Sequence, residues 1–194
     1  MDASEARDHL QWVDGILRAA DRTLHLPPAT LIAWGIVAVV INALHQAAVL
    51  GISVPHDGRV QLPMFAAAIA VSVWAGARSP LGRRTLVDSN AGIVFCVVFA
   101  VLLVINITSQ DRVVPVRAMA LFWCVAYSIA LLVVGIQASR PLWVGGIIML
   151  AACSVASFFP EWFDGILALG WALGFIGPGV ALALGRQHGR TSAV

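Results

Sequence analysis

The feature that most constrains the fold is a succession of long apolar segments. Six stretches carry almost no charged side chains, and each approaches the roughly 20 residues that a helix needs to cross a hydrocarbon core of about 30 Å. They lie at residues 29–52, 61–77, 91–109, 116–137, 141–159 and 163–185. The composition agrees, because 60% of the residues are hydrophobic and only 11% are charged, against about a quarter in a typical soluble domain. We therefore expect an all-α integral membrane protein built as a bundle of six transmembrane helices.

The connections between these segments are short, so neighbouring spans should run antiparallel. Pro63, Pro115 and Pro141 fall at the expected helix starts, where a missing backbone N–H is tolerated. Only Pro178 falls inside a span. The bundle accordingly occupies residues 27–185, with an N-terminal segment at 1–26 and a tail at 186–194.

Arginine sets the expected orientation, because the chain has no lysine and all 12 basic residues are Arg. With six spans both termini share a side, and nine arginines fall on that side against three on the other. The positive-inside bias then places both termini in the cytoplasm of a multi-pass protein of the cell inner (plasma) membrane. Residues 1–26 carry charges of both signs and no apolar core, so we expect no signal peptide there.

A search for catalytic motifs is negative. The expected spans hold no Asp, Glu, Lys or Arg away from their ends, and the sequence has no phosphate-binding glycine loop, HExxH or GxSxG motif. Cys96, Cys124 and Cys153 lie on three different spans without CxxC spacing, which is typical of small buried hydrophobic residues. We expect no enzyme activity, cofactor or metal, and the segments outside the spans are too short for a nucleic-acid-binding domain.

Polar residues inside the spans are then the candidates for a ligand or pore site. They are Asn42, His45, Gln46, Asn106 and Ser157. At about 1.5 Å per residue, His45 lies roughly 25 Å from Pro28, in the outer third of the first span. Gly35, Ala38, Asn42 and His45 share one helix face. Two interpretations stay open: these polar groups bond across a helix contact, or they line a pocket open to the outer side.

The last span is rich in small residues that allow helices to approach closely. The residues expected to pack in this way are Gly170, Gly174, Gly177 and Pro178. A hinge at the proline is the alternative. At the start of this span, Asp164 follows Trp162 and is expected to cap the helix.

Before the first span, residues 4–28 predict an amphipathic cytoplasmic helix. Its apolar positions recur at heptad spacing and form an association stripe of Ala6, Leu10, Val13, Leu17, Ala20 and Leu24. Pro27 and Pro28 separate it from the membrane. Residues 1–26 carry five acidic side chains against three arginines, a sign that disfavours anionic lipid and favours contact with protein.

These features favour a non-enzymatic membrane subunit or regulator in the lipid bilayer, assembling as a homo-oligomer or within a larger membrane complex. The alternative is a small permease or channel for a neutral or apolar compound, with an outward-facing polar pocket.

Overall fold

The computed structural model describes residues 27–55, 58–78, 93–102, 104 and 116–191, and throughout these ranges the regular structure is helical. The elements are α2 (Pro28–Val49), α3 (Gly58–Ala77), a shorter helix Ile93–Leu102, α5 (Val116–Ala138), α6 (Arg140–Phe158), α7 (Phe163–Trp171), the π-helical turn η2 (Ala172–Ile176) and α8 (Gly177–Thr191). α7, η2 and α8 follow one another without a break and form the last helix. The N-terminal segment with its predicted stripe, and Asn106, lie outside the described residues.

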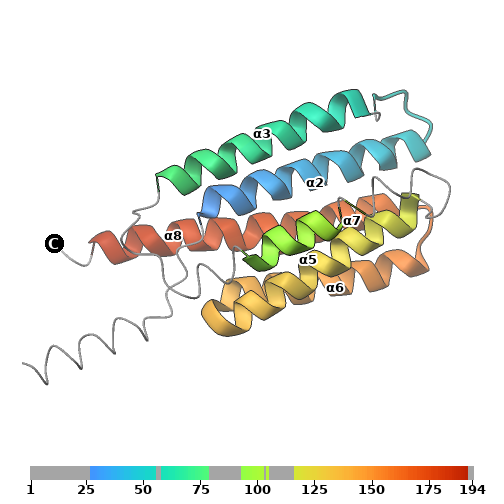
Figure 1. The fold of residues 1–194 in the computed structure, drawn as a ribbon. Coiled ribbons are helices and arrows are strands. Elements are labelled where there is room, and N and C mark those ends of the chain that lie inside the picture. Colours follow the sequence, from blue (N-terminus) through green and yellow to red (C-terminus); the bar gives the residue numbers. More distant parts are fainter. Residues whose placement is uncertain (1–26, 56–57, 79–92, 103, 105–115, 192–194) are drawn as a thin grey trace, which may run out of the picture.

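Five helices are long and apolar enough to cross a membrane. They are Pro28–Val49, Val60–Ala77, Arg117–Ile136, Arg140–Phe158 and Phe163–Gly185. The expected span at 91–109 is described as the apolar helix Ile93–Leu102, and most of its remainder lies outside the described residues. The helices run roughly along one direction (Figure 1), with the α2–α3 connection and the α6–α7 turn at one end and the C-terminus at the other.

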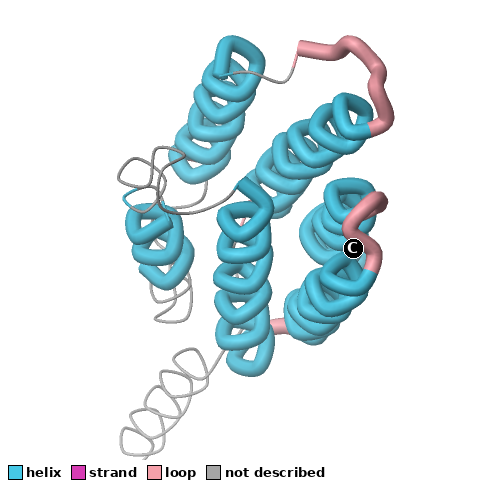
Figure 2. Tube along the Cα trace, turned by 90° about the vertical axis from the view of Figure 1, so that its right-hand side faces the viewer, coloured by secondary structure: helices cyan, strands magenta, loops and turns pink. Residues whose placement is uncertain are grey.

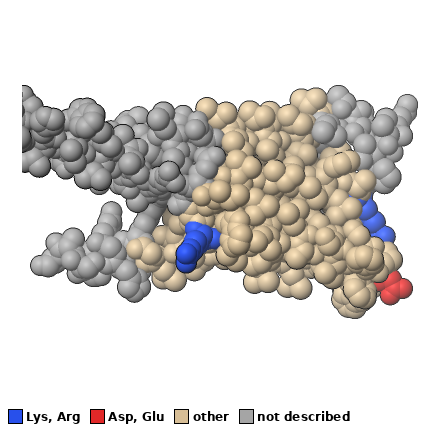
Figure 3. Space-filling view, turned by 90° about the horizontal axis from the view of Figure 1, so that it is seen from below, with Lys and Arg blue, Asp and Glu red and all other residues tan. Residues whose placement is uncertain are grey.

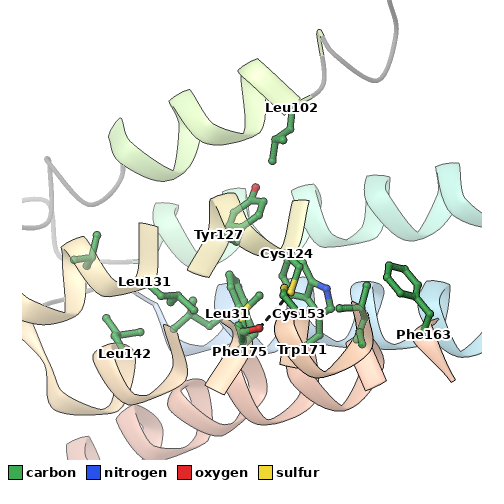
Figure 4. Packing of buried hydrophobic residues seen from close by; sticks show 14 residues of the cluster. Leu31, Leu102, Cys124, Tyr127, Leu131, Leu142, Cys153, Phe163, Trp171 and Phe175 are labelled. Atoms are coloured by element: carbon green, nitrogen blue, oxygen red, sulfur yellow. Dashed lines mark hydrogen bonds between the residues drawn. The ribbon is translucent and has the colours of Figure 1, made fainter. Parts of the chain in front are cut away.

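The core lies between the α5–α6 hairpin, the last helix and α2. Cys124, Leu131, Leu142, Met149 and Leu167 are completely or almost completely buried there. Figure 4 labels Cys124, Leu131 and Leu142 in this cluster. α3 contributes little to this core and packs beside α2 at the edge of the bundle (Figure 2). Lipid tails are as apolar as these side chains, so close packing rather than removal from water holds such helices together.

Pro63 corrects one expectation from the sequence. α3 begins at Gly58 instead of near Gln61, so Pro63 lies inside the helix and not at its start. The apolar block begins only at residue 60 or 61, and hydrophobicity therefore placed the boundary too late. The proline ring removes one backbone N–H, which leaves the carbonyl four residues earlier without its usual helical partner.

Glycines bring α6 and the last helix into backbone contact. A Cβ atom on Gly145 would overlap the carbonyl oxygen of Gly174 and would stand 2.7 Å from Cγ of Pro178. One turn before Gly174, a Cβ atom on Gly170 would lie 2.6 Å from that of Ala152. Gly177 differs, because among the described residues no atom lies within 4 Å of its added Cβ. Gly170, Gly174 and Pro178 thus lie at this helix contact, whereas Gly177 faces away from it.

A row of aromatic rings crosses the bundle from α3 to the last helix. Successive ring centroids are 5.0 to 6.0 Å apart, a spacing at which each pair contributes about 0.5–1.5 kcal/mol. In order, the rings are Phe65, Trp34, Phe99, Trp123, Tyr127, Trp171 and Phe175. The row connects α3, α2, the helix Ile93–Leu102, α5 and the last helix. Its ring contacts help to hold α3, which has few other neighbours, against the bundle.

Candidate functional site

Polar and charged side chains from four helices meet at the end of the bundle that carries the α6–α7 turn. α2 ends here with His45 and Gln46, α3 begins here with Gln61, and α5 begins here with Arg117. α7 adds Asp164 in its first turn. On the face of the molecule drawn in Figure 3, the charged atoms lie toward the two ends, with uncharged surface between them.

The side-chain amide of Gln46 hydrogen-bonds α2 to the α6–α7 turn and to the first turn of α7, using both its nitrogen and its oxygen. Its Nε2 donates to the backbone carbonyl of Glu161 at 2.8 Å, and its Oε1 accepts from the backbone N–H of Gly165 at 2.9 Å. The side chain is only 7% exposed. We call this pair of hydrogen bonds the Gln46 bridge.

The Gln46 bridge also caps α7. The first N–H groups of a helix have no partner within the helix, and Trp162, which precedes α7, makes no side-chain capping bond. Gly165 is the third residue of α7, and its N–H is bound by Gln46 of α2. Asp164, the cap expected from the sequence, instead lies within the first turn of the helix. The capping oxygen thus comes from another helix, a contact that local sequence cannot reveal.

Asn42 and Ser157 bond to their own helices. Nδ2 of Asn42 donates to the carbonyl of Ala38 at 2.8 Å, and Oγ of Ser157 donates to the carbonyl of Cys153 at 2.9 Å. Asn42 is buried at 8% exposure, whereas Ser157 is exposed. Of the predicted polar group, the structure therefore brings Asn42, His45 and Gln46 together on α2 and leaves Ser157 on the outside of α6.

His45 turns toward α3. Its Nε2 lies 3.4 Å from Nε2 of Gln61. The two side chains thus approach each other across the α2–α3 contact. The ring is half-buried. His45 is thus less enclosed than Gln46, although the sequence placed both in one polar group.

Asp164 is buried at 6% exposure beside two basic side chains. Both His45 of α2 and Arg117 of α5 act electrostatically on its carboxyl group. The guanidinium of Arg117 also lies over the ring of Phe163, 5.7 Å from the centroid, within the range of a cation–π contact. A carboxylate in the first turn is further favoured by the helix dipole. The starts of α5 and α7 thus meet at the contact between Arg117 and Phe163, with Asp164 adjacent to Phe163 in the first turn of α7.

Sequence reasoning missed Gln61, Arg117 and Asp164 as members of this cluster. Their positions could have identified them, because each lies within a few residues of an expected span boundary, and these boundaries are all expected on the same side of the membrane. Among the described residues no group of three or more His, Cys, Asp or Glu side chains could hold a metal ion. The contacts in this cluster join the ends of neighbouring helices.

Comparison with protein-family profiles, with curated proteins and with solved structures finds no match to the chain. The class of protein is therefore argued from the fold and the site. The five long helices are long and apolar enough to cross a membrane, which is compatible with a multi-pass membrane protein. The buried amide side chains of Asn42 and Gln46 hydrogen-bond to backbone groups of α2, of α7 and of the α6–α7 turn.

Proposed function

We propose that the chain is a non-enzymatic multi-pass membrane subunit or regulator that assembles with itself or with a partner membrane protein. The Gln46 bridge is the observation that carries this proposal. A transport path needs polar groups that can bind its solute, whereas both amide atoms of Gln46 are bound to backbone and Asn42 is bound to α2 itself. Gln46 thus joins α2 to the α6–α7 turn and to α7, and the amide nitrogen of Asn42 is already bound within α2, which favours a packing role over a solute path.

The proposal includes six spans, with residues 91–109 as the third, and both termini in the cytoplasm of the inner (plasma) membrane. Its support is the distribution of arginine, nine on the terminal side against three on the other. Within the proposed third span, Ile93–Leu102 forms an apolar helix, which also supports the proposal.

Cysteine labelling tests this topology. Single cysteines are placed at Arg78, Arg83, Arg84 or within the C-terminal "GRQHGR", and others at His56 or Glu161, in a chain whose own three cysteines are replaced by serine. In intact cells a membrane-impermeant maleimide is expected to label positions 56 and 161 and to leave the arginine positions unlabelled until the membrane is opened. The reverse pattern would contradict the proposed orientation.

Association is assigned to the N-terminal stripe. Its apolar positions have the period of an interhelical seam, and burying leucines such as Leu10 and Leu17 in a protein contact contributes about 1.5–3 kcal/mol each as an upper range. Ordering the helix reduces this gain. Assembly partners are already concentrated in the plane of the membrane, so the remainder is enough to hold a complex.

The double variant Leu10→Asp, Leu17→Asp tests this assignment by native mass measurement in detergent. We expect it to lose its partner copies or partner protein while the membrane bundle remains inserted, because both substitutions lie outside the expected spans. The matched control is Gln11→Asp with Ala19→Asp, which adds the same charge on the opposite face of the predicted helix and should keep the native mass. Retention of the native mass by the stripe variant would move the association to the membrane faces.

The alternative, a permease or channel for a neutral or apolar compound, is favoured by one observation. His45 and Gln61 are in contact beside the buried Asp164 at the end of the bundle assigned to the outer side. A small molecule that co-purifies with a monomeric chain and is lost from His45→Leu would support this function over the subunit.

A further inference from the structure

The guanidinium of Arg78 is held over an exposed tryptophan at the end of α3. Its Cζ lies 4.2 Å from the centroid of the Trp74 ring, within the range of a cation–π contact. Trp74 is 52% exposed, and Arg78 is exposed as well. The acidic side chains of the described residues, Glu161 and Asp164, lie at the opposite end of the bundle. The cation is therefore fixed on the outer surface without a carboxylate from the described residues to balance it.

The position of Arg78 along the bundle follows from the register of α2 and α3. Nε2 of His45 lies 3.4 Å from Nε2 of Gln61. Nearer the other end, Nε1 of Trp34 donates to Oγ of Ser72 at 3.1 Å. Eleven residues separate these two contacts on each helix, so the antiparallel helices stay in register and Arg78 is level with the first residue of α2. The apolar span of α3 ends at the residue before Arg78, which places the guanidinium where hydrocarbon gives way to lipid headgroups.

The same face of α3 continues from Arg78 into the apolar span. Counting back from Arg78, its residues recur at spacings of four, four, three and four, which keeps them on one side of a helix. All are exposed, and those beyond the tryptophan are small or compact. In order they are Arg78, Trp74, Ala70, Ala67 and Pro63, and we call them the Arg78 face. A cation at the headgroup level thus stands above a shallow apolar surface on which an acyl chain can lie.

We propose that the Arg78 face binds one anionic phospholipid, whose phosphate oxygens accept hydrogen bonds from the guanidinium of Arg78. A guanidinium offers paired N–H donors that match the geometry of phosphate. Stacking on Trp74 occupies the flat face of the guanidinium and leaves the N–H groups at its edge able to donate. An anionic lipid is favoured over a zwitterionic one because it supplies the net negative charge that the described protein surface around Arg78 lacks. This inference needs the bundle to span a bilayer, but it does not depend on what the chain assembles with.

The test uses the full chain in phosphatidylcholine vesicles that contain phosphatidylglycerol as a minor component. Either lipid carries a photoreactive diazirine in its acyl chain, and peptide mass spectrometry measures the ratio of phosphatidylglycerol to phosphatidylcholine crosslinks on α3. We expect this ratio to exceed the ratio of the two lipids in the vesicle. Arg78→Gln should lower it about fivefold, which corresponds to the roughly 1 kcal/mol that one arginine contributes beside anionic lipid. Trp74→Leu keeps the charge but removes the stacking surface, so it should lower the ratio as well.

Arg140→Gln is the matched control, because Arg140 is an exposed arginine that begins α6 at the same end of the bundle (Figure 1). It removes the same charge and should leave the ratio on α3 unchanged. An equal fall in Arg140→Gln and Arg78→Gln would mean a diffuse attraction to positive charge and would overturn the site. Inorganic phosphate, compared with chloride at equal ionic strength, should also leave the ratio unchanged. If phosphate abolishes the preference, the ligand is a soluble anion and the assignment to a lipid is wrong.

Discussion

Gly145→Ala is expected to lower the free energy of unfolding of the bundle by about 1–3 kcal/mol, the usual cost of overpacking a close contact. The added methyl group would overlap the carbonyl oxygen of Gly174 and press on the ring of Pro178. Neither neighbour can turn aside, because one is helix backbone and the other is a ring closed onto the backbone. α6 and the last helix must therefore separate. Reversible unfolding in a detergent and denaturant mixture, followed by circular dichroism, measures the loss.

Gly177→Ala is the matched control. The substitution is the same and lies in the last helix, but among the described residues no atom comes within 4 Å of the new methyl group. Alanine also favours a helix over glycine by about 1 kcal/mol. We expect this variant to be as stable as the parent or slightly more stable. Equal stability losses in the two variants would mean that the glycine contact between α6 and the last helix is not formed.

Gln46→Leu is expected to lower the free energy of unfolding by about 1–3 kcal/mol, the cost of leaving buried polar groups without partners. Leucine has a similar size but can neither accept from the N–H of Gly165 nor donate to the carbonyl of Glu161. Hydrogen exchange distinguishes this mechanism from a general loss of packing. The Gly165 amide should exchange much faster in the variant, while amides in the middle of α6 keep their protection.

Ser157→Ala provides the comparison for Gln46. Its hydroxyl bonds only to the carbonyl of Cys153 on its own helix, and the side chain is exposed, so removing it should change stability by less than about 0.5 kcal/mol. Unchanged exchange at Gly165 in Gln46→Leu would contradict the assignment of Gln46 as the cap of α7.

Apolar length was enough to locate five of the six expected helices, because a long segment without charge can satisfy its own backbone hydrogen bonds as a helix. The sequence placed a span at 141–159, and α6 runs Arg140–Phe158. Helix ends are harder, because polar residues continue a helix beyond the apolar block. α3 begins at Gly58 for this reason, and the position of Pro63 was consequently wrong.

The site was only partly predictable. Periodicity put Asn42 and His45 on one face of the first span but did not determine how that face is rotated toward its neighbours. The structure buries Gln46 more deeply than His45. The partners of Gln46 are Glu161 and Gly165, and no local sequence pattern predicts that these residues pack against α2.

The Gln46 bridge also has a consequence for how the chain is made. Its two partners are translated 115 and 119 residues after Gln46, a delay on the order of ten seconds at ordinary rates of synthesis. During that interval the side chain of Gln46 lacks the two backbone groups that later bind it, and a polar group buried without a hydrogen bond is costly. Until α7 has been made, water or another part of the chain must therefore hydrogen-bond the amide of Gln46. A chain that ends before Phe163 would lack the N–H of Gly165, so the oxygen of the Gln46 amide would have to be satisfied elsewhere.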